Sequence, residues 1–324
     1  MSKKSLMKIA LVCVALALIS VILYSGLQLL ESTVFYREQN EWTGESKTIE
    51  RDGVKYFPRQ DITVVMVLGI NRRGPVAPTP VNEGGAADMI TLIIFDEKDQ
   101  TYSLLSVNRD SMINIPVLDE KGNICGTYFG QAAFAHTYGT GMDDSSENTR
   151  KAVSNFLHGI TIDHYVTLNM DAIAILNDAV GGVTVNVTDD FSAVDDTLKK
   201  GEQKLTGEQA VSFVQSRFHV GDELNTSRIR RQQEYMENFM PLLDEKMEKD
   251  STFVLKTFEE LSKYIVTDCS ANVLSSLAER YGDYTQKENV TPAGENVVGE
   301  YMEFYVDEEK LDELVVRLFY APKA

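Results

Sequence analysis

Residues 62–68 read ITVVMVL, an uninterrupted run of residues that are apolar or β-branched. A short run of this kind, followed directly by a glycine, is typical of a strand that is buried on both faces of a sheet. Two more strand patterns follow at residues 89–95 and 102–107, and the polar residues 96–100 form a turn between them. We therefore expect these three strands to form the centre of the fold.

The rest of the chain alternates between helical and strand patterns. Helices are expected at 131–138, 147–157, 171–180 and 207–214, from 227 past 237, at 252–264, at 270–281 and from 307 onward. Strands are expected at 165–169, 183–187 and 300–306, and a hairpin at 48–57, around Asp52-Gly53. This alternation predicts a single layered α/β domain over residues 48–324. Residues 69–88 are rich in Gly, Pro and Asn, and a loop of this length is more often functional than idle.

An uncharged apolar segment occupies residues 9–30. As a helix it would be about 33 Å long, enough to cross a hydrocarbon core of about 30 Å. Lysines precede it, so the positive-inside rule predicts a cytoplasmic tail at 1–8, a transmembrane helix at 9–30 and an extracellular domain behind a polar spacer at 31–47. The alternative is a cleaved signal peptide, whose apolar part is usually only about 7–15 residues long.

The chain is strongly acidic. Its 324 residues include 31 Lys+Arg and 49 Asp+Glu, for a formal net charge of −18. Three of the basic residues and none of the acidic ones precede residue 31, so the remaining portion has a net charge of −21. Nucleic-acid binding is excluded, because it normally requires a basic surface. Cys125 and Cys269 either form a disulfide or remain as two buried thiols.

Against this acidic background, arginines gather at the ends of strands and the starts of helices. Arg72 and Arg73 follow the first strand, and Arg109, next to Asp110, follows the third. Arg217 follows a helix. In α/β sheets the ends of strands are where ligand-binding groups are placed.

The start of the long helix carries three more arginines. Arg228, Arg231 and Gln232 have i,i+3 and i,i+4 spacing and therefore share a face, whereas Arg230 points away. Thr226 or Ser227 is the expected N-cap. Two guanidinium groups beside a helix N-terminus form a site for phosphate or pyrophosphate. The alternative is a surface helix whose arginines pair with nearby glutamates.

Asp88 ends the small-residue stretch GGAAD and opens a strand. A carboxylate beside clustered arginines either bridges them or holds a divalent cation, and Mg²⁺ is the natural ion for a phosphate ester. An ordinary loop cap or ion pair is the alternative. The four histidines have no ligand spacing, and the motifs of serine hydrolases, P-loop enzymes and HExxH zinc proteases are missing from the sequence.

Seven segments together resemble the LytR-CpsA-Psr (LCP) family of Gram-positive cell-envelope phosphotransferases. They are ITVVMVLGIN (62–71), ADMITLIIFD (87–96), SVNRDSM (106–112), QAAFAHTYGTG (131–141), GITIDHYVTLNMDAIAILNDAVGGVTVNV (159–187), LTGEQAVSFVQSR (205–217) and SRIRRQQ (227–233). The resemblance implies transfer of a glycopolymer from a polyprenyl-pyrophosphate carrier to a peptidoglycan hydroxyl at the cell membrane. It also implies a central mixed sheet flanked by helices that enclose a tunnel for the lipid.

The resemblance also assigns roles to residues. Catalytic roles fall to Arg109, Asp110, Arg217 and Arg228, which would surround the pyrophosphate; Asp110 is a candidate base but is better suited to an ion pair. Substrate-binding roles fall to Arg72 or Arg73, Arg231 and Gln232. Asp88 and Asn71 would hold Mg²⁺.

Three positions depart from the family pattern. Asn71 stands where Asp is usual and Gln215 where Arg is frequent, so weaker Mg²⁺ binding is expected, and Asn108 stands where Pro is usual. Asn71 and Gln215 favour an alternative function: a catalytically degenerate module that binds polyprenyl phosphate or regulates the cell envelope.

A lipid carrier would require an apolar pocket near the arginines. The candidate lining residues are Phe134, Ile173, Ile175, Leu176, Val211 and Phe213. The competing interpretation is that these residues belong to the ordinary hydrophobic core, because apolar stripes on helices normally face the interior.

Overall fold

The structure, a computed structural model, describes residues 48–324 except 52, 251–252, 271–272, 274–275, 278–279, 299–301 and 323–324. The predicted cytoplasmic tail (1–8), transmembrane helix (9–30) and spacer (31–47) lie outside the described residues. Within the part that is described, no helix combines the length and the apolar character needed to cross a membrane.

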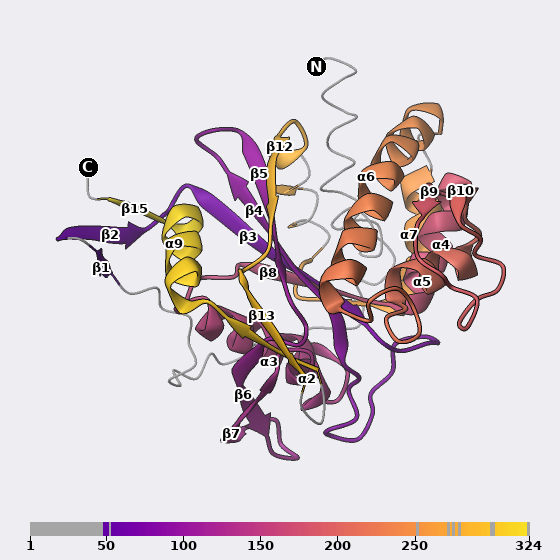
Figure 1. Ribbon diagram of the computed structural model, residues 1–324. Coiled ribbons are helices and arrows are strands. Elements are labelled where there is room, and N and C mark those ends of the chain that lie inside the picture. Colours follow the sequence, from indigo (N-terminus) through magenta and orange to yellow (C-terminus); the bar gives the residue numbers. More distant parts are fainter. Residues whose placement is uncertain are drawn as a thin grey trace, which may run out of the picture.

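A six-stranded mixed sheet lies at the centre of the molecule (Figure 1). In spatial order its strands are β11 (Ile265–Thr267), β8 (His164–Asn169), β3 (Ile62–Ile70), β4 (Ala87–Asp96), β5 (Thr101–Val107) and β12 (Thr285–Val290). β3 is parallel to β8, and β5 is parallel to β12; the other neighbours are antiparallel. The predicted mixed α/β fold and its first three strands are therefore confirmed.

Different helices cover the two faces of the sheet. Val64, Met66 and Leu68 of β3 point into one hydrophobic cluster, whereas Val65 points into another. The first cluster is completed by α2 (Phe134–Thr137), α3 (Asp143–Phe156) and α9 (Glu308–Phe319), the second by α4 (Met170–Val180) and α7 (Phe253–Leu261). Burial on both faces explains why β3 shows no alternation of polar and apolar residues.

A third hydrophobic cluster lies beside the sheet. It is built from the end of α4, α5 (Gly207–Gln215), α6 (Asn225–Lys249) and β9 (Thr184–Val187), and β9 pairs with β10 (Gly201–Lys204). Phe213 of α5 contacts this cluster together with Tyr235 and Phe239 of α6. Figure 1 shows α6 standing alongside α5 and the β9–β10 pair. This packing brings the start of α6 next to the end of α5.

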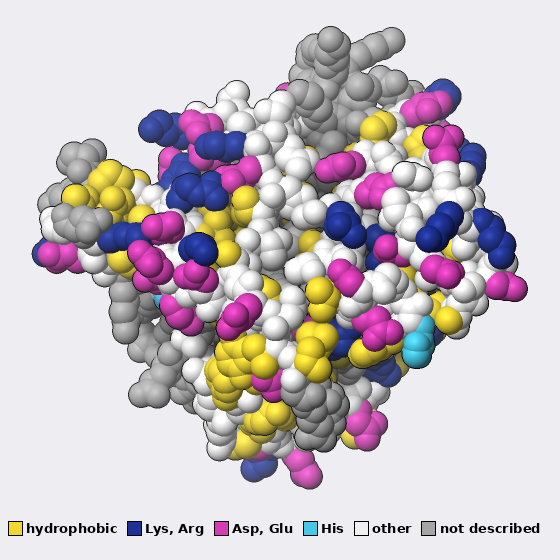
Figure 2. All heavy atoms as spheres, in the orientation of Figure 1, with side chains coloured by type: hydrophobic (Ala, Val, Ile, Leu, Met, Phe, Trp, Pro, Cys, Tyr) yellow, Lys and Arg dark blue, Asp and Glu magenta, His cyan; other side chains and the backbone are white. Residues whose placement is uncertain are grey.

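Smaller sheets surround the main one. They are the pairs β6 (Met112–Leu118) with β7 (Ile124–Gln131) and β13 (Gly294–Val298) with β14 (Met302–Val306), and the three-stranded β1 (Ile49–Arg51), β2 (Val54–Pro58) and β15 (Tyr320–Pro322). A short 3-10 helix, η2 (Ser262–Tyr264), precedes β11. Exposed apolar side chains, including Phe129 and Val298, gather over β6–β7 and β13–β14 (Figure 2). The predicted hairpin at 48–57 is confirmed as β1 and β2.

Several predicted elements differ from the observed ones. The helix expected at 131–138 is reduced to the four residues of α2, because residues 124–131 pair with 112–118 in a hairpin. α6 begins at Asn225, before the predicted cap, and Ser227 donates its hydroxyl hydrogen bond to Asp222 instead. The helix expected at 270–281 falls partly on residues that are not described.

The two cysteines of the domain are not paired. Both thiols are free, so the predicted disulfide is wrong. The alternative prediction of two buried thiols is confirmed for Cys269, but Cys125 is exposed.

Candidate active site

Asp88 lies at a break in the ladder between β3 and β4. Gly69 pairs with Met89 and Ile70 with Ala87, so Asp88 is a bulged residue without a partner on β3. A bulge of this kind redirects a side chain and is frequent beside active sites. The Asp88 carboxylate is buried; one oxygen lies 3.0 Å from Arg109 Nε and the other 3.6 Å from an Arg228 Nη atom.

A tight turn after β5 presents Arg109 and Asp110. The Ser111 amide donates to the carbonyl of Asn108 at 2.9 Å, and the Asp110 amide donates to the Asn108 side chain at 3.0 Å. Asp110 is completely buried and lies 3.1 Å from Arg109 Nη1. Burial raises the pKa of the Asp110 carboxyl, and the surrounding guanidinium groups act in the opposite direction.

Arg217 approaches the same carboxylate from the other side. It follows α5 and forms a hydrogen-bonded ion pair with Asp110, and its guanidinium group lies 4.5 Å from the ring centroid of exposed Phe218. Asp110 therefore lies between two guanidinium groups. In this position it holds Arg109 and Arg217 together, which is a structural role and leaves it poorly placed to accept a substrate proton.

Arg228 reaches the site from the first turns of α6. Its Nε donates to Asn225 at 3.0 Å, and Nη1 donates to the carbonyl of Gln215 at 3.2 Å. Only 3% of Arg228 is exposed, and burial, reinforced by Arg109 and Arg217, lowers its pKa to about 10. The group therefore stays charged at neutral pH.

These side chains form the arginine cluster: Arg109, Arg217 and Arg228 around Asp88 and Asp110. Three cations face two carboxylates, so the cluster holds one positive charge more than its own carboxylates compensate. A charge buried without full compensation is costly unless a ligand completes it. Guanidinium groups bind phosphate oxygens in a bidentate manner, so the cluster is chemically suited to an anionic phosphate.

Three neutral amides support the cluster and were not predicted from the sequence. Asn225 donates to Asn108 at 2.8 Å and links α6 to the turn after β5. Gln131, the last residue of β7, donates to Asp110 at 3.1 Å. Neutral amides do not stand out by charge in a sequence. Asn108 and Asn225 begin the motifs NRD and NTSR, which could have drawn attention to them, whereas Gln131 lies in neither motif.

Arg231 and Gln232 share a helix face with Arg228, as predicted, but they do not enter the cluster. Arg231 pairs with Asp189 at 2.7 Å and donates to the carbonyls of Phe213 and Ser216. Gln232 donates to the carbonyl of Val214 at 3.0 Å. Through these hydrogen bonds, both side chains link α6 to the end of α5.

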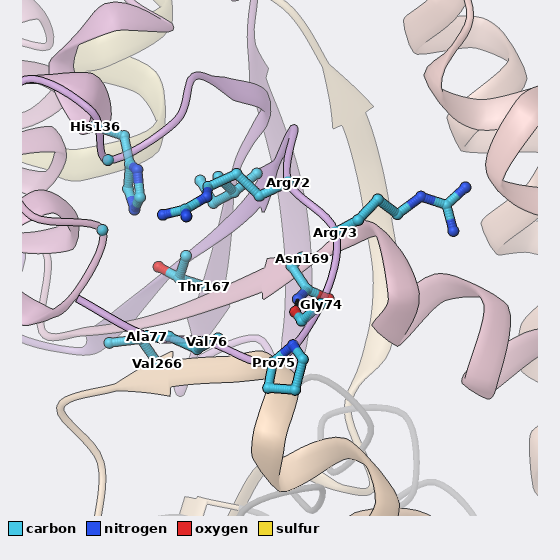
Figure 3. Close-up of a pocket in the computed structure, with 13 residues that line it drawn as sticks. Arg72, Arg73, Gly74, Pro75, Val76, Ala77, His136, Thr167, Asn169 and Val266 are labelled. Carbon is cyan, nitrogen blue, oxygen red and sulfur yellow. Dashed lines mark hydrogen bonds between the residues drawn. The ribbon is translucent and has the colours of Figure 1, made fainter. Parts of the chain in front are cut away.

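Arg72 and Arg73 point in different directions (Figure 3). Exposed Arg73 pairs with Asp171 at the start of α4 and with Glu208 at the start of α5, at 2.9 and 2.8 Å. Arg72 points toward His136 and lines a separate pocket. Neither side chain contacts the carboxylates of the arginine cluster.

Two of the three departures from the family pattern prove to be neighbours in space. Gln215 Nε2 donates to Asn71 Oδ1 at 2.6 Å. Replacing an aspartate and an arginine by this pair removes one negative and one positive charge, so the net charge at the position is unchanged. Asn71 and Gln215 therefore form a matched neutral pair.

The predicted apolar lining residues do not share one cavity. Phe134 packs against the first cluster, Ile175 against the second, and Ile173 and Phe213 against the third, where Phe213 is fully buried. The competing interpretation as ordinary core is therefore confirmed for Phe213, whereas Phe134, Ile173 and Ile175 are half-buried at the margins of their clusters.

The donor chemistry at Asp88 fits Mg²⁺, which is commonly held by one or two carboxylates together with substrate phosphates. Both oxygens of Asp88 now face guanidinium groups, so a phosphate would have to attract Arg109 and Arg228 away before the metal could bind. Among the described residues, the grouping of three possible metal ligands lies elsewhere: His164, Asp268 and Cys269 have ligand atoms within 4.8 Å of one another.

Comparisons with known proteins agree with the fold and the motifs. A model described as the LytR_cpsA_psr family matches residues 29–319. The polyisoprenyl-teichoic acid--peptidoglycan teichoic acid transferase TagU of Bacillus cereus is 30% identical over 154 residues, which cover 48% of this chain and 44% of that protein. The chain spans about half the length of the curated relatives it matches.

Two solved structures share the fold. The structure titled "TagT bound to LI-WTA" has a TM-score of 0.58 and 23% identity, covering 80% of this chain and 90% of that one. Protein gbs0355 from Streptococcus agalactiae has a TM-score of 0.64 and 19% identity, covering 80% and 86%. At such low identity the likeness shows the fold alone.

Proposed function

The chain belongs to the LytR_cpsA_psr family, and on that basis we propose that it is a phosphotransferase of the cell envelope. The proposed donor is a glycopolymer on a polyprenyl-pyrophosphate carrier, and the proposed acceptor is a sugar hydroxyl of peptidoglycan. The names of curated relatives, which are teichoic acid transferases, support this reaction class. The observation that carries the proposal is the convergence of Arg109, Arg217 and Arg228 on two buried carboxylates.

The proposed location is the cell membrane of a Gram-positive bacterium. The apolar segment at 9–30 would anchor the chain once, with its N-terminus in the cytoplasm and the domain outside. Tethering suits an enzyme whose donor is itself a membrane lipid.

The proposed reaction is a displacement at phosphorus. The acceptor hydroxyl oxygen bonds to the phosphorus that carries the glycopolymer, and the bond from that phosphorus to the bridging oxygen breaks. Polyprenyl phosphate leaves with the electron pair, and the hydroxyl proton passes to water or to the departing phosphate. The cluster's uncompensated positive charge would bind the diphosphate, and its guanidinium groups would stabilise charge developing on the oxygens.

Mg²⁺ is proposed as the cofactor, with Asp88 and the side-chain carbonyl oxygen of Asn71 as its protein ligands. A bound Mg²⁺ would neutralise phosphate charge as a Lewis acid. The role of this chain's own residues is to position: Asp110 holds Arg109 and Arg217, and Asn225 holds Arg228.

The test is transfer of a labelled lipid-linked saccharide to peptidoglycan by the full chain, with and without Mg²⁺. Arg109→Lys keeps the charge but loses the planar fork, so we expect a rate loss of roughly 10²–10³-fold. Arg230→Lys, on the exposed side of α6, is the matched control and should retain full transfer. Full transfer by Arg109→Lys would contradict the proposal.

The alternative is a module that binds polyprenyl phosphates, or regulates the envelope, without transfer. The neutral Asn71–Gln215 pair favours it, because Asn71 brings no charge to a metal. The variants Asn71→Asp, Gln215→Arg and their combination separate the two functions. An inert wild type with an active Asn71→Asp or double variant would make the binding module the better account, whereas an active wild type would exclude it.

A further inference from the structure

A second basic pocket lies at the ends of β3 and β8, apart from the arginine cluster (Figure 3). About 350 Å³ of space at this pocket is not filled by protein atoms, and part of that space is open solvent. Its polar lining includes Arg72, Arg73, His136, Thr167 and Asn169, and none of the five residues of the arginine cluster lines it. The site and the inference below are independent of the proposed transfer reaction.

Arg72 points into this pocket without a partner. Its backbone is fixed, because its amide donates to the Ile70 carbonyl at 2.8 Å and its carbonyl accepts from Met170 at 3.0 Å. Among the residues described, none forms a hydrogen bond or ion pair with its guanidinium group. Gly141, with a φ of +80°, leaves room for that group: a Cβ there would lie 2.9 Å from Arg72 Nη1. Because a half-buried cation without a counter-ion is unfavourable, an anion that pairs with Arg72 would be stabilising.

His136 supplies a hydrogen-bond acceptor in the same pocket. Its Nδ1 lies 2.9 Å from the carbonyl oxygen of Gly85, and because a carbonyl only accepts, Nδ1 carries the hydrogen. Burial lowers the pKa of His136 to about 4; hydrogen bonding to the backbone of Gly85 and Gly84 and the charge of Asp144 oppose this effect, and Arg72 adds to it. The ring is therefore neutral near neutral pH, and Nε2 holds a lone pair.

That lone pair has no donor. His136 is only 1% exposed, and Nε2 is buried without a hydrogen-bond partner among the described residues. The other polar groups nearby are already engaged: Thr167 bonds with Ser146 at 2.8 Å, and Asn169 caps α4. One cationic donor and one neutral acceptor therefore remain.

We propose that this pocket binds a phosphate group that still carries a hydrogen, with Arg72 holding its charged oxygens and His136 Nε2 accepting from its P–OH. Inorganic phosphate has such a hydrogen throughout the neutral range. A phosphate monoester has it only below its second pKa of about 6. Sulfate and phosphodiesters carry charge but no hydrogen, so they leave the buried acceptor unpaired, which is costly.

The test is calorimetric titration of the full chain in detergent with inorganic phosphate, ethyl phosphate, sulfate and dimethyl phosphate, at about pH 6 and about pH 8. Because the arginine cluster could bind anions as well, this pocket is identified as the binding that Arg72→Gln removes and that Arg230→Gln, at an exposed residue that does not line the pocket, retains. For that site we expect sulfate and dimethyl phosphate to bind at least about tenfold more weakly than phosphate.

The two sources of the ligand separate by pH. Ethyl phosphate that binds at about pH 6 and weakens at about pH 8 indicates the end group of a larger molecule, and inorganic phosphate alone indicates free phosphate; both support the proposal. In the wild-type chain labelled with ¹⁵N-histidine, the Nε2 resonance of His136 should shift with phosphate and not with sulfate. Equal affinity of this site for phosphate and sulfate, an unchanged resonance, or phosphate binding by Arg72→Gln that equals that of the wild type would overturn the proposal.

Discussion

Arg228 and Arg231 lie one turn apart on α6 and are almost equally buried, at 3% and 4% exposure, yet their surroundings differ. Arg231 has a carboxylate of its own, Asp189, together with two carbonyls and the ring of Phe191. Arg228 shares Asp88 with Arg109. The charge of Arg231 is compensated by Asp189, whereas Arg228 belongs to the arginine cluster, which has one positive charge more than its carboxylates compensate.

The difference shows how a structural arginine can be told from a binding one. Burial alone does not separate them, and neither does helix face, because both side chains point toward α5. The ratio of cations to carboxylates does: it is one to one at Arg231 and three to two in the arginine cluster. Substitutions in the arginine cluster and around Arg231 test whether an excess of cations over carboxylates marks the arginines that bind substrate.

The largest effect is expected from Asp110→Asn. The substitution removes the charge between Arg109 and Arg217 while keeping the side-chain shape, so guanidinium groups would repel one another in a buried site. Breaking such a pair costs about 3–5 kcal/mol of unfolding free energy. Urea denaturation should show this loss, and a stability equal to wild type would contradict the bridging role of Asp110.

Arg228→Lys and Arg231→Lys should have opposite profiles. We expect Arg228→Lys to lower transfer by roughly 10²-fold, since a lysine cannot offer a bidentate fork. Arg231→Lys should lower the unfolding free energy by about 2 kcal/mol, through lost bonds to Phe213 and Ser216, with transfer by the folded fraction unchanged. If both variants lose activity at equal stability, the distinction between the two regions is wrong.

Asp189→Asn sharpens the contrast on the structural side. The amide can still accept from Arg231 but offers no charge, so we expect a loss of about 1–2 kcal/mol in unfolding free energy. Anion affinity at the arginine cluster, measured by phosphate titration, should not change. A rise in that affinity would mean that Arg231 is not confined to its place between α5 and α6.

The smallest effect is expected from Asn108→Ala. It removes the acceptor for Asn225 and for the Asp110 amide, so Arg228 loses its indirect support, whereas Arg231 is untouched. We expect a stability loss of about 1 kcal/mol and a few-fold fall in transfer rate. An increase in KM without a change in kcat would instead place Asn108 in substrate binding.

The sequence predicted the centre of this molecule better than its periphery. β3 and β4 consist of long apolar runs that can only be buried, so their position was readable from local pattern. The β6–β7 hairpin was missed because most of β7 is exposed and its residues, ICGTYFGQ, lack a clear alternation. Residues 131–138 have helical apolar spacing, which predicts a helix where the end of β7 lies.

The site was predictable where charge marked it. Asp88, Arg109, Asp110, Arg217 and Arg228 all come together, and each stood out against an acidic chain. Sequence could not assign Arg73 and Arg231 elsewhere, because their partners Asp171, Glu208 and Asp189 are distant in sequence. Nor could it place Arg72 beside His136, which lies in another element. The Asn71–Gln215 contact was equally hidden, although both positions had been noted as departures.

The pairing of β15 with β2 also bears on how the chain is made. Residues 320–322 form the outer strand beside 54–58, so the hairpin of β1 and β2 is synthesised long before the strand that covers its edge. Until then β2 presents unpaired backbone groups, the feature that most readily recruits a strand from another molecule. Premature termination, even a few residues before Tyr320, should therefore yield a product prone to aggregation and proteolysis, although every residue of the arginine cluster would already be in place.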